Sequence, residues 1–286
     1  MVSLLSASSF FRGHRHNKCQ NRITPAQFLF SGQTSITKIA LITGGSRGLG
    51  KDMALRIARK GLDVIITYRS QEEEAKQVVK EIEESGRKAA ALHLDMSDFS
   101  SLDNFVKDVS NCLQSTWGVG ELDYLVNNAG MGATVPFEKV TEELFNDFLN
   151  VHFKGIYFLT QKILPHLNKD GGIINISTGT TRFANPGYSV YASMKGAIEV
   201  FTKYLAKELG AKGIRSNVVA PGPIETDFNS GAIRSNPEMK NRLSTLSPLG
   251  RVGRADDIGG VVAFLCTEDA TWINGQRIEV SGGING

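Results

Sequence analysis

The sequence predicts an α/β protein, a single domain built on a doubly wound parallel sheet that is flanked by helices. Short apolar segments alternate with longer amphipathic ones, at about thirty residues per pair, as in repeated strand–helix–strand units. The first apolar segment ends in a glycine-rich turn that opens a helix, and crossovers of this kind are right-handed. No repeat, linker or second domain interrupts the pattern. The fold is therefore expected to cover residues 38–286.

The first half of the chain supplies three strand–helix pairs. Strands are expected at 38–45, 63–69 and 88–95, and helices at 46–61, 71–86 and 100–118. The first of these helices keeps its apolar residues at a spacing that packs against a sheet. In the second helix, apolar residues face inward and acidic residues face outward.

The second half continues the alternation. Strands are expected at 122–130, 171–177, 214–222 and 276–280, with helices at 141–166, from near Tyr188, and at 256–266. Residues 221–253 form a long connection without a clear period. Long irregular segments inside compact domains are typical of lids and binding loops.

Composition and charge exclude several classes of protein. The chain is 41% hydrophobic and 21% charged, which is typical of a globular protein with a substantial core. No uncharged apolar run approaches the ~18 residues that a membrane span needs. Four of the basic residues lie within residues 1–37; without them the chain holds 28 basic and 29 acidic residues, which argues against a nucleic-acid surface.

Residues 1–37 differ in amino-acid composition from the rest of the chain. They are rich in serine, carry Arg12, Arg15, Lys18 and Arg22, and contain no acidic residue. This composition is typical of an organelle transit peptide, which predicts a mitochondrial or plastid location. The alternatives are a disordered tail or an upstream start that is rarely used, and the protein would then be cytoplasmic.

The cysteines indicate neither a metal site nor a disulfide framework. Cys19, Cys112 and Cys266 are an odd, scattered set without the spacing of metal ligands. A reducing compartment is expected, and no bound metal.

The candidate catalytic pair is Tyr191 and Lys195. Four residues apart on a helix, they lie on the same face. A phenol titrates near pH ~10 in water, and a neighbouring ammonium favours the phenolate. The spacing therefore predicts a proton donor or acceptor whose pKa is lowered by its neighbour. Tyr188 has no such partner and is interpreted as packing or substrate wall.

The candidate nucleotide site is the first strand-to-helix turn, Thr43-Gly44-Gly45-Ser46-Arg47-Gly48-Leu49-Gly50. Glycines let the backbone approach a diphosphate, whose charge the N-terminus of the next helix stabilises. The spacing is not G-x-G-x-x-G, so the prediction depends on the position of the turn. The alternative is a glycine-rich turn that only packs tightly.

Cofactor preference is expected at the ends of the second and third strands. The second strand ends in Arg69 rather than in an acid, and Arg47 adds a second cation nearby. Arginine suits a phosphate, which favours NADP(H) over NAD(H), although dual use stays open. Asp95 is placed to contact the adenine amino group or, alternatively, to cap the following helix.

Four motifs in one order resemble the short-chain dehydrogenase/reductase family: Thr43-Gly-x-x-x-Gly-x-Gly, Asn127-Asn128-Ala129-Gly130, Tyr191-x-x-x-Lys195 and Pro221-Gly222. The resemblance covers about residues 38–286. It implies a single Rossmann-type domain, a nicotinamide cofactor, and hydride transfer to or from a carbonyl carbon. By the same resemblance, Tyr191 is the general acid in reduction, and Lys195 binds the nicotinamide ribose and lowers the pKa of Tyr191.

The resemblance also implies which residues line the cofactor site. Asn127, the first residue of the second motif, is expected to brace neighbouring strands rather than to contact the cofactor. The expected cofactor-binding residues are Thr43, Gly44, Ser46, Arg47, Gly48, Leu49, Gly50, Arg69, Asp95, Met96, Asn128, Ala129, Gly130, Tyr191, Lys195, Pro221, Gly222, Ile224 and Thr226.

Two positions depart from the family pattern. Thirteen residues before the tyrosine stands Thr178, where serine is commoner; it keeps the hydroxyl that holds the substrate oxygen, and Ser177 is the fallback. Where the family carries asparagine in Asn-x-x-Gly, this chain has His152, three residues before Gly155. Neutral imidazole both donates and accepts, so His152 is expected to hold the water that links Lys195 to solvent, with a structural histidine as the equal alternative.

The sequence therefore predicts an NADP(H)-preferring oxidoreductase that interconverts a carbonyl and an alcohol on a partly apolar small molecule. A narrower alternative is a 3-oxoacyl-thioester reductase of organellar fatty-acid synthesis, which needs a basic patch around Arg234, Lys240 and Arg242 for an acidic carrier protein. An alternative of another class is a catalytically silent nucleotide-binding sensor. The resemblance also implies a homo-oligomer, a tetramer or dimer, formed through the 141–166 helix and the Tyr191 helix.

Overall fold

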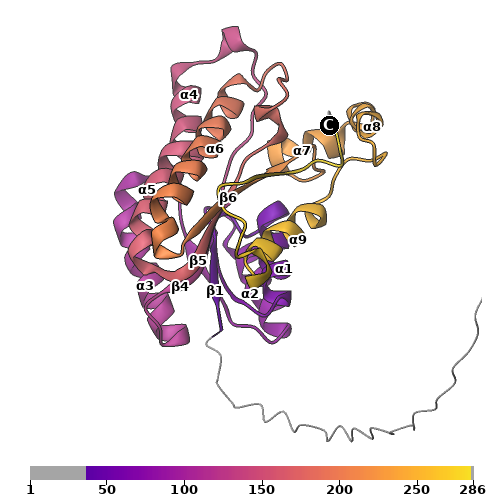
Figure 1. Ribbon diagram of the computed structural model, residues 1–286. Coiled ribbons are helices and arrows are strands. Elements are labelled where there is room, and N and C mark those ends of the chain that lie inside the picture. Colours follow the sequence, from indigo (N-terminus) through magenta and orange to yellow (C-terminus); the bar gives the residue numbers. More distant parts are fainter. Residues whose placement is uncertain (1–36, 285–286) are drawn as a thin grey trace, which may run out of the picture. The chain divides into compact units, whose positions relative to one another are not determined.

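The computed structural model describes residues 37–284 (Figure 1). The proposed transit peptide lies outside the described residues, apart from Thr37, and remains a prediction. The strands are β1 (Ile39–Ile42), β2 (Asp63–Tyr68), β3 (Ala89–His93), β4 (Leu122–Asn127), β5 (Leu167–Ile176), β6 (Arg215–Pro221) and β7 (Arg277–Val280). The α-helices are α1 (Gly48–Arg59), α2 (Glu72–Glu84), α3 (Leu102–Trp117), α4 (Glu142–Leu149), α5 (Gly155–Ile163), α6 (Ser189–Leu209), α7 (Phe228–Ser235), α8 (Pro237–Leu246) and α9 (Ala255–Leu265).

The seven strands form one parallel sheet in the order β3-β2-β1-β4-β5-β6-β7, which confirms the predicted fold class. The strand order reverses between β1 and β4. In sheets of this type, the crevice at the carboxyl ends of the strands beside that reversal is where ligands bind. The predicted glycine turn follows β1 and therefore lies beside it.

Two helical layers cover the sheet, as Figure 1 shows: α1, α2 and α9 on one face, and α3 to α6 on the other. Because successive side chains of a strand point to opposite faces, Ala40 and Ile42 join one core while Ile39 and Leu41 join the other. Every residue of β1 and β6 is buried, as expected for central strands covered on both sides.

The predicted long helix at 141–166 is wrong in its interior. It is α4, then a π-helical turn over Asn150–Lys154, then α5 and a final 3₁₀ turn. A π turn inserts one residue into the helix, and such turns occur frequently at functional sites. Here the turn contains His152. Nothing in the apolar spacing of the segment signals the inserted residue.

The predicted irregular connection at 221–253 is also wrong, because it contains α7 and α8. The start of α8 carries a local signal: the Asn236 side chain accepts a hydrogen bond from the Met239 N–H (2.9 Å), and Pro237 occupies the first turn. No residue of α8 is buried, so the helix lacks the apolar face from which periodicity is recognised. We call α7 and α8, residues 228–246, the lid.

Strand β5 begins at Leu167, four residues before the predicted start. Asp170 adopts a left-handed φ of 63°, and the pairing register between β4 and β5 shifts at this end. Lys169 and Asp170 therefore look like a turn in the sequence but lie in a bulged strand. No helix within residues 37–284 is long and apolar enough to cross a membrane.

Candidate active site

The glycine turn, residues 43–50, is fixed by hydrogen bonds to the neighbouring strand ends. The buried Thr43 hydroxyl accepts from the backbone N–H groups of Asn128 and Ala129, each at 3.0 Å. In return, the Asn128 amide donates to the carbonyl oxygens of Thr43 (2.9 Å) and Gly44 (3.1 Å). The Gly44 N–H donates to the hydroxyl of Thr67 on β2 at 3.0 Å. Asn128 and Thr43 thus build the turn.

The same turn has the features of a diphosphate cradle. A Cβ at Gly50 would lie 2.1 Å from the Gly44 carbonyl oxygen, so α1 packs directly against the turn. A Cβ at Gly48 would meet nothing within 4 Å, so the backbone there faces open space, at a φ of 56° that favours glycine. The first turn of α1 holds no acidic residue, and its N-cap makes no side-chain bond to the helix. The backbone N–H groups in the first turn of α1 therefore suit an anion.

The remaining predicted nucleotide contacts surround this cradle. Arg47 in the turn and Arg69 after β2 are both exposed, and neither forms an ion pair within the described residues. Asp95 follows β3 and accepts from the Ser97 N–H (2.9 Å) and hydroxyl (2.6 Å). The alternative that it caps the following helix is wrong, because Asp98 is the N-cap there and accepts from the Ser100 N–H (3.0 Å). Met96 is buried, with its carbonyl oxygen 2.5 Å from where a Gly155 Cβ would lie.

On the other side of the crevice, glycines again allow close contact. A Cβ at Gly130 would lie 2.8 Å from His152 Cε1, and one at Gly222 would lie 2.8 Å from Ser281 Cα. Ile224 forms an isolated bridge with Gly253, and the Thr226 hydroxyl accepts from the Phe228 N–H at 3.3 Å. A cleft of about 340 Å³ runs from Gly48 to Thr226 and the start of the lid. Two predicted nucleotide contacts from opposite sides, Gly48 and Thr226, therefore border one cleft.

Tyr191 lies in an aromatic cluster at the crevice. Its ring makes edge contacts with His152 (centroids 5.2 Å apart), Phe148 (6.3 Å) and Tyr188 (6.4 Å), and Phe228 of the lid covers it at 5.8 Å. Burial raises the pKa of the Tyr191 phenol, and the nearby Thr178 hydroxyl opposes that rise. The Thr178 hydroxyl therefore lies close to the Tyr191 phenol.

Lys195 lies one helical turn further on, buried, with its Nζ 5.9 Å from the centre of the Tyr191 ring. Its ammonium donates to the carbonyl oxygen of Ile176 on β5 at 2.7 Å. Burial lowers the pKa of Lys195 to about 8. In the protein alone the ammonium points at β5 and burial of the phenol raises the pKa of Tyr191, so the expectation that Lys195 lowers this pKa stays a prediction.

Ser177 turns away from Tyr191, so the structure favours Thr178 over the fallback. The Ser177 hydroxyl donates to Glu199 at 2.7 Å, behind the turn. The Thr178 hydroxyl instead accepts from the N–H (3.3 Å) and the hydroxyl (3.2 Å) of Thr180. The catalytic role of Thr178 stays a prediction.

His152 is fully buried in the π turn, and its ring stacks on Phe148 with centroids 5.3 Å apart. Its Nε2 lies 2.8 Å from the Met131 carbonyl oxygen and 3.2 Å from the Met131 N–H. Burial and the Lys195 charge lower the pKa of His152 to about 3, so the ring is neutral near pH 7. Its Nδ1 is buried and has no protein partner among the described residues. His152 thus adjoins the site, and its role in a relay stays a prediction.

Some residues that build the site are visible in the sequence only as polar residues inside apolar strands or helices. Asn127 donates to Asn175 (2.8 Å) and Thr160 (3.1 Å), which confirms that it braces neighbouring strands. Asn175 in turn donates to Thr202 of α6 at 2.9 Å. Thr67, Asn175 and Thr202 escaped prediction, although each interrupts an apolar pattern.

Known proteins resemble this chain in sequence. Residues 44–285 match the family described as "Enoyl-(Acyl carrier protein) reductase". A hydroxynaphthalene reductase-like protein of Metarhizium robertsii is 36% identical over 258 residues, 86% of this chain and 94% of its own length. The 3-oxoacyl-acyl-carrier-protein reductase FabG of Staphylococcus aureus is 35% identical over 251 residues, 87% of this chain and 98% of its own length.

Solved structures agree. The angucycline C-6 ketoreductase LanV, crystallised with bound NADP, superposes with a TM-score of 0.83 at 36% identity, covering 87% of this chain and 96% of that one. A family match over most of the chain, relatives above 30% identity and the geometry of Tyr191 and Lys195 agree. The chain belongs to the short-chain dehydrogenase/reductase family of oxidoreductases.

Proposed function

We propose that this chain is an NADP(H)-dependent oxidoreductase that reduces a carbonyl to an alcohol or catalyses the reverse reaction. One observation carries the proposal: at the carboxyl ends of the strands, the Thr178 hydroxyl lies close to the Tyr191 phenol, and the buried ammonium of Lys195 lies 5.9 Å from the centre of the Tyr191 ring. The glycine turn lies across the same crevice. A proton donor, an oxygen-binding hydroxyl and a nucleotide cradle together fit hydride transfer.

The chemistry divides between the cofactor and the protein. NADPH, when bound, supplies the hydride. Tyr191 gives its proton to the substrate oxygen as negative charge develops there, and the Thr178 hydroxyl donates a hydrogen bond to the same oxygen. Because the pKa of Lys195 is about 8, its ammonium is charged at neutral pH and stabilises the phenolate that Tyr191 becomes.

The preference for NADP(H) is supported by two exposed guanidinium groups, those of Arg47 and Arg69, beside the expected position of the adenosine ribose. Among the similar structures, LanV was crystallised with NADP. Replacing both arginines by alanine should raise the KM for NADPH by roughly tenfold and leave that for NADH unchanged, since only the phosphorylated cofactor loses a charge-assisted contact. Equal changes in both constants would reject the preference.

The substrate class is a ketone on a partly apolar body. Tyr188, which the sequence predicted as packing or substrate wall, and Phe228 of the lid flank Tyr191. Two similar proteins are named as an angucycline C-6 ketoreductase and a hydroxynaphthalene reductase-like protein. Screening ketones, aldehydes and alcohols with NADPH and NADH tests the proposal. Turnover of apolar ketones with NADPH is expected; cofactor binding without turnover of any compound would instead support the silent sensor.

The second candidate, a 3-oxoacyl-thioester reductase, is supported by the similarity to FabG. The basic patch it needs is partly neutralised, because Arg234 pairs with Asp227 and Lys240 pairs with Glu225 (2.8 Å). Arg242 remains exposed on α8. Kinetics with a carrier-bound and a free 3-oxoacyl substrate separate the candidates: a much higher kcat/KM for the carrier-bound form would favour this one.

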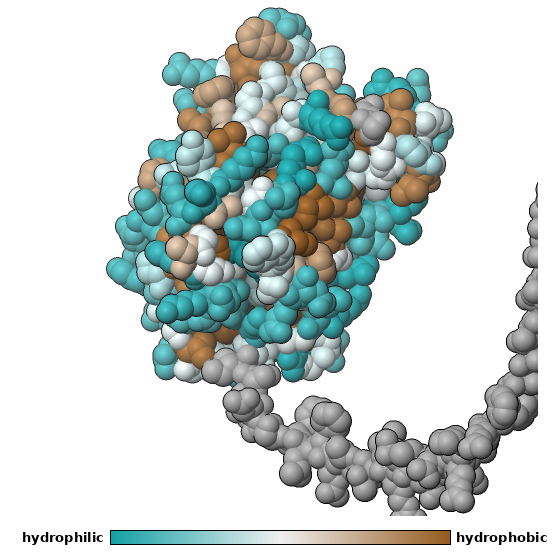
Figure 2. All heavy atoms as spheres, in the orientation of Figure 1, coloured by the Kyte–Doolittle hydropathy of each residue, from teal (hydrophilic) through white to brown (hydrophobic). Residues whose placement is uncertain are grey.

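We further propose a homo-oligomer formed through α5 and α6. A groove between these helices is lined by aromatic residues, and Val200 (53% exposed) and Tyr204 (63% exposed) face outward rather than toward the sheet. Figure 2 shows a second hydrophobic patch near the middle of the surface in view, where β7 and α9 lie in Figure 1. Two such surfaces suit a tetramer with two kinds of interface. Light scattering after size exclusion tests this; Tyr204→Glu should shift the mass downward.

The composition of residues 1–37 supports a further proposal, that they direct the protein to a mitochondrion or plastid. Fusing these residues to a fluorescent protein tests it. Accumulation of the fusion in the cytosol would reject the proposal.

A further inference from the structure

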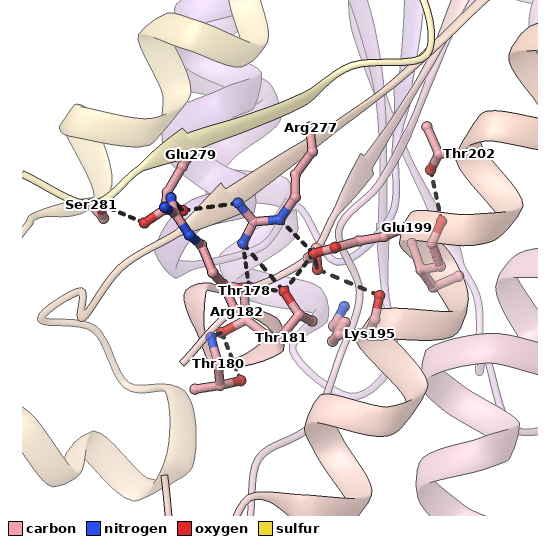
Figure 3. A network of polar contacts seen from close by, with 12 residues as sticks. Thr178, Thr180, Thr181, Arg182, Lys195, Glu199, Thr202, Arg277, Glu279 and Ser281 are labelled. Atoms are coloured by element: carbon pink, nitrogen blue, oxygen red, sulfur yellow. Dashed lines mark hydrogen bonds and ion pairs between the residues drawn. The ribbon is translucent and has the colours of Figure 1, made fainter. Parts of the chain in front are cut away.

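Helix α6 presents a third polar residue on the face that carries Tyr191 and Lys195. Glu199 follows Lys195 by four residues, so the three side chains form one stripe along the helix. The Glu199 carboxylate oxygen Oε1 accepts from the Ser177 hydroxyl (2.7 Å), the Thr181 hydroxyl (2.7 Å) and Arg277 Nε (2.9 Å). Figure 3 shows Glu199 and Arg277 pointing toward each other behind the turn that carries Thr178.

These contacts surround Thr178 without using its hydroxyl. Ser177 precedes Thr178, and Thr181 ends the 3₁₀ turn that follows it. The Thr178 carbonyl oxygen accepts from the Thr181 hydroxyl (2.9 Å) and from Arg277 Nη2 (3.3 Å). The backbone is therefore held before, at and after Thr178, while the Thr178 hydroxyl accepts from Thr180 and lies close to the Tyr191 phenol.

Arg277 comes from the opposite end of the chain, on edge strand β7. Its side chain is 21% exposed, that of Glu199 is 17% exposed, and Arg277 Nη1 also donates to Glu279 at 2.9 Å. Burial alone would lower the pKa of Arg277, but its hydrogen bonds to Glu279 and Glu199 outweigh that effect and raise it. Partly buried charged groups with several partners each hold their neighbours in one arrangement, and losing one partner leaves the others uncompensated.

We propose that Glu199 and Arg277 are positioning residues, which hold the Thr178 turn so that the Thr178 hydroxyl stays aligned with the Tyr191 phenol. This inference rests on the proposed function, because it assigns a purpose to the alignment. The ion pair also couples strand β7 and helix α6 to the reacting atoms. Catalysis is sensitive to displacements of about 1 Å, so loosening this turn should reduce kcat.

The test compares Glu199→Ala and Glu199→Gln in the full-length protein, with NADPH and a ketone that the wild type reduces. The alanine variant should lose roughly 10- to 100-fold in kcat, with the Kd for NADPH unchanged, since the glycine turn is untouched. Glutamine keeps an acceptor oxygen and should recover part of the loss. Arg277→Met should match Glu199→Ala, and the double variant should be no worse than either one.

Arg87→Met is the matched control. Arg87 pairs with Asp63 at the amino end of β2 (3.9 Å), an arginine–carboxylate pair whose side chains are 34% and 7% exposed and which lies away from the Thr178 turn. The Arg87→Met variant should leave kcat unchanged. If Glu199→Ala keeps kcat within about twofold of an active wild type, the inference is overturned.

A second measurement does not need turnover. Hydrogen exchange of residues 177–182 should become faster in Glu199→Ala and Arg277→Met but not in Arg87→Met, because the ion pair anchors that segment. Unchanged exchange overturns the inference, whatever the activity. An inactive wild type whose exchange responds as expected would overturn only the proposed reaction and leave the positioning role supported.

Discussion

The glycine turn and the lid border the same cleft but are built in different ways. The turn is held by short hydrogen bonds among Thr43, Thr67 and Asn128, most of them to backbone groups, and α1 packs against it without space for a Cβ at Gly50. The lid has no buried residue in α8, exposes Phe228 and Leu246, and pairs two cations, Arg234 and Lys240, with acids at the surface.

The difference separates two tasks. A cofactor common to many enzymes meets backbone groups whose positions are fixed by a few polar side chains and glycines, whereas the substrate meets exposed side chains that change readily. This is why the cofactor class is readable from this chain and the individual ketone is not. The comparison predicts that changes in the turn affect stability and cofactor affinity, and that changes in the lid affect only the substrate.

Among changes in the turn and the lid, the largest effect is expected for Gly50→Ala in the turn. Its new Cβ would lie 2.1 Å from the Gly44 carbonyl oxygen, so the turn must move. We expect a loss of about 1–3 kcal/mol in the free energy of unfolding and a more than tenfold weaker Kd for NADPH, measured by denaturation and fluorescence titration. Gly260→Ala in α9 is the control, because its Cβ meets nothing within 4 Å and should stabilise slightly. Equal effects of Gly50→Ala and Gly260→Ala would contradict the claim that the turn is a tightly packed cofactor site.

A pH profile gives the next effect. Lys195 has a pKa of about 8, so its ammonium is present below that pH and is lost above it. Because the ammonium stabilises the Tyr191 phenolate, kcat for reduction should fall up to tenfold per unit above pH ~8. Neighbouring groups do not titrate near pH 8: His152 is neutral there, with a pKa of about 3, and burial raises the pKa of Tyr191. A flat profile from pH 6 to 10 contradicts this account.

The smallest effect is expected in the lid. Phe228 covers Tyr191 at 5.8 Å and is 43% exposed, so Phe228→Ala removes part of an apolar wall. The KM for an apolar ketone should rise about fivefold, for roughly 1 kcal/mol of lost burial, with the Kd for NADPH unchanged. Leu246→Ala, on the outer helix of the lid, should leave both constants unchanged. A weaker Kd for NADPH in Phe228→Ala would show that the lid also serves the cofactor.

The sequence predicted the parts that depend on local pattern. Alternating periodicity located the seven strands, and the four motifs placed Tyr191, Lys195 and the glycine turn around one crevice. The parts that failed depend on distant neighbours. The pKa of Tyr191 is raised because segments remote in the chain bury it, and Glu199 gains its contacts only when β7 and α6 meet. The π turn at His152 and the helices of the lid have no apolar signature that would reveal them.

The central claim is that the Tyr191 phenol donates the proton. Tyr191→Phe keeps the ring and its contacts with His152 and Phe148 and removes only the hydroxyl. Measured at saturating NADPH and ketone, kcat should fall by about 10²- to 10⁴-fold while the Kd for NADPH stays the same. Turnover close to that of the wild type would contradict the account.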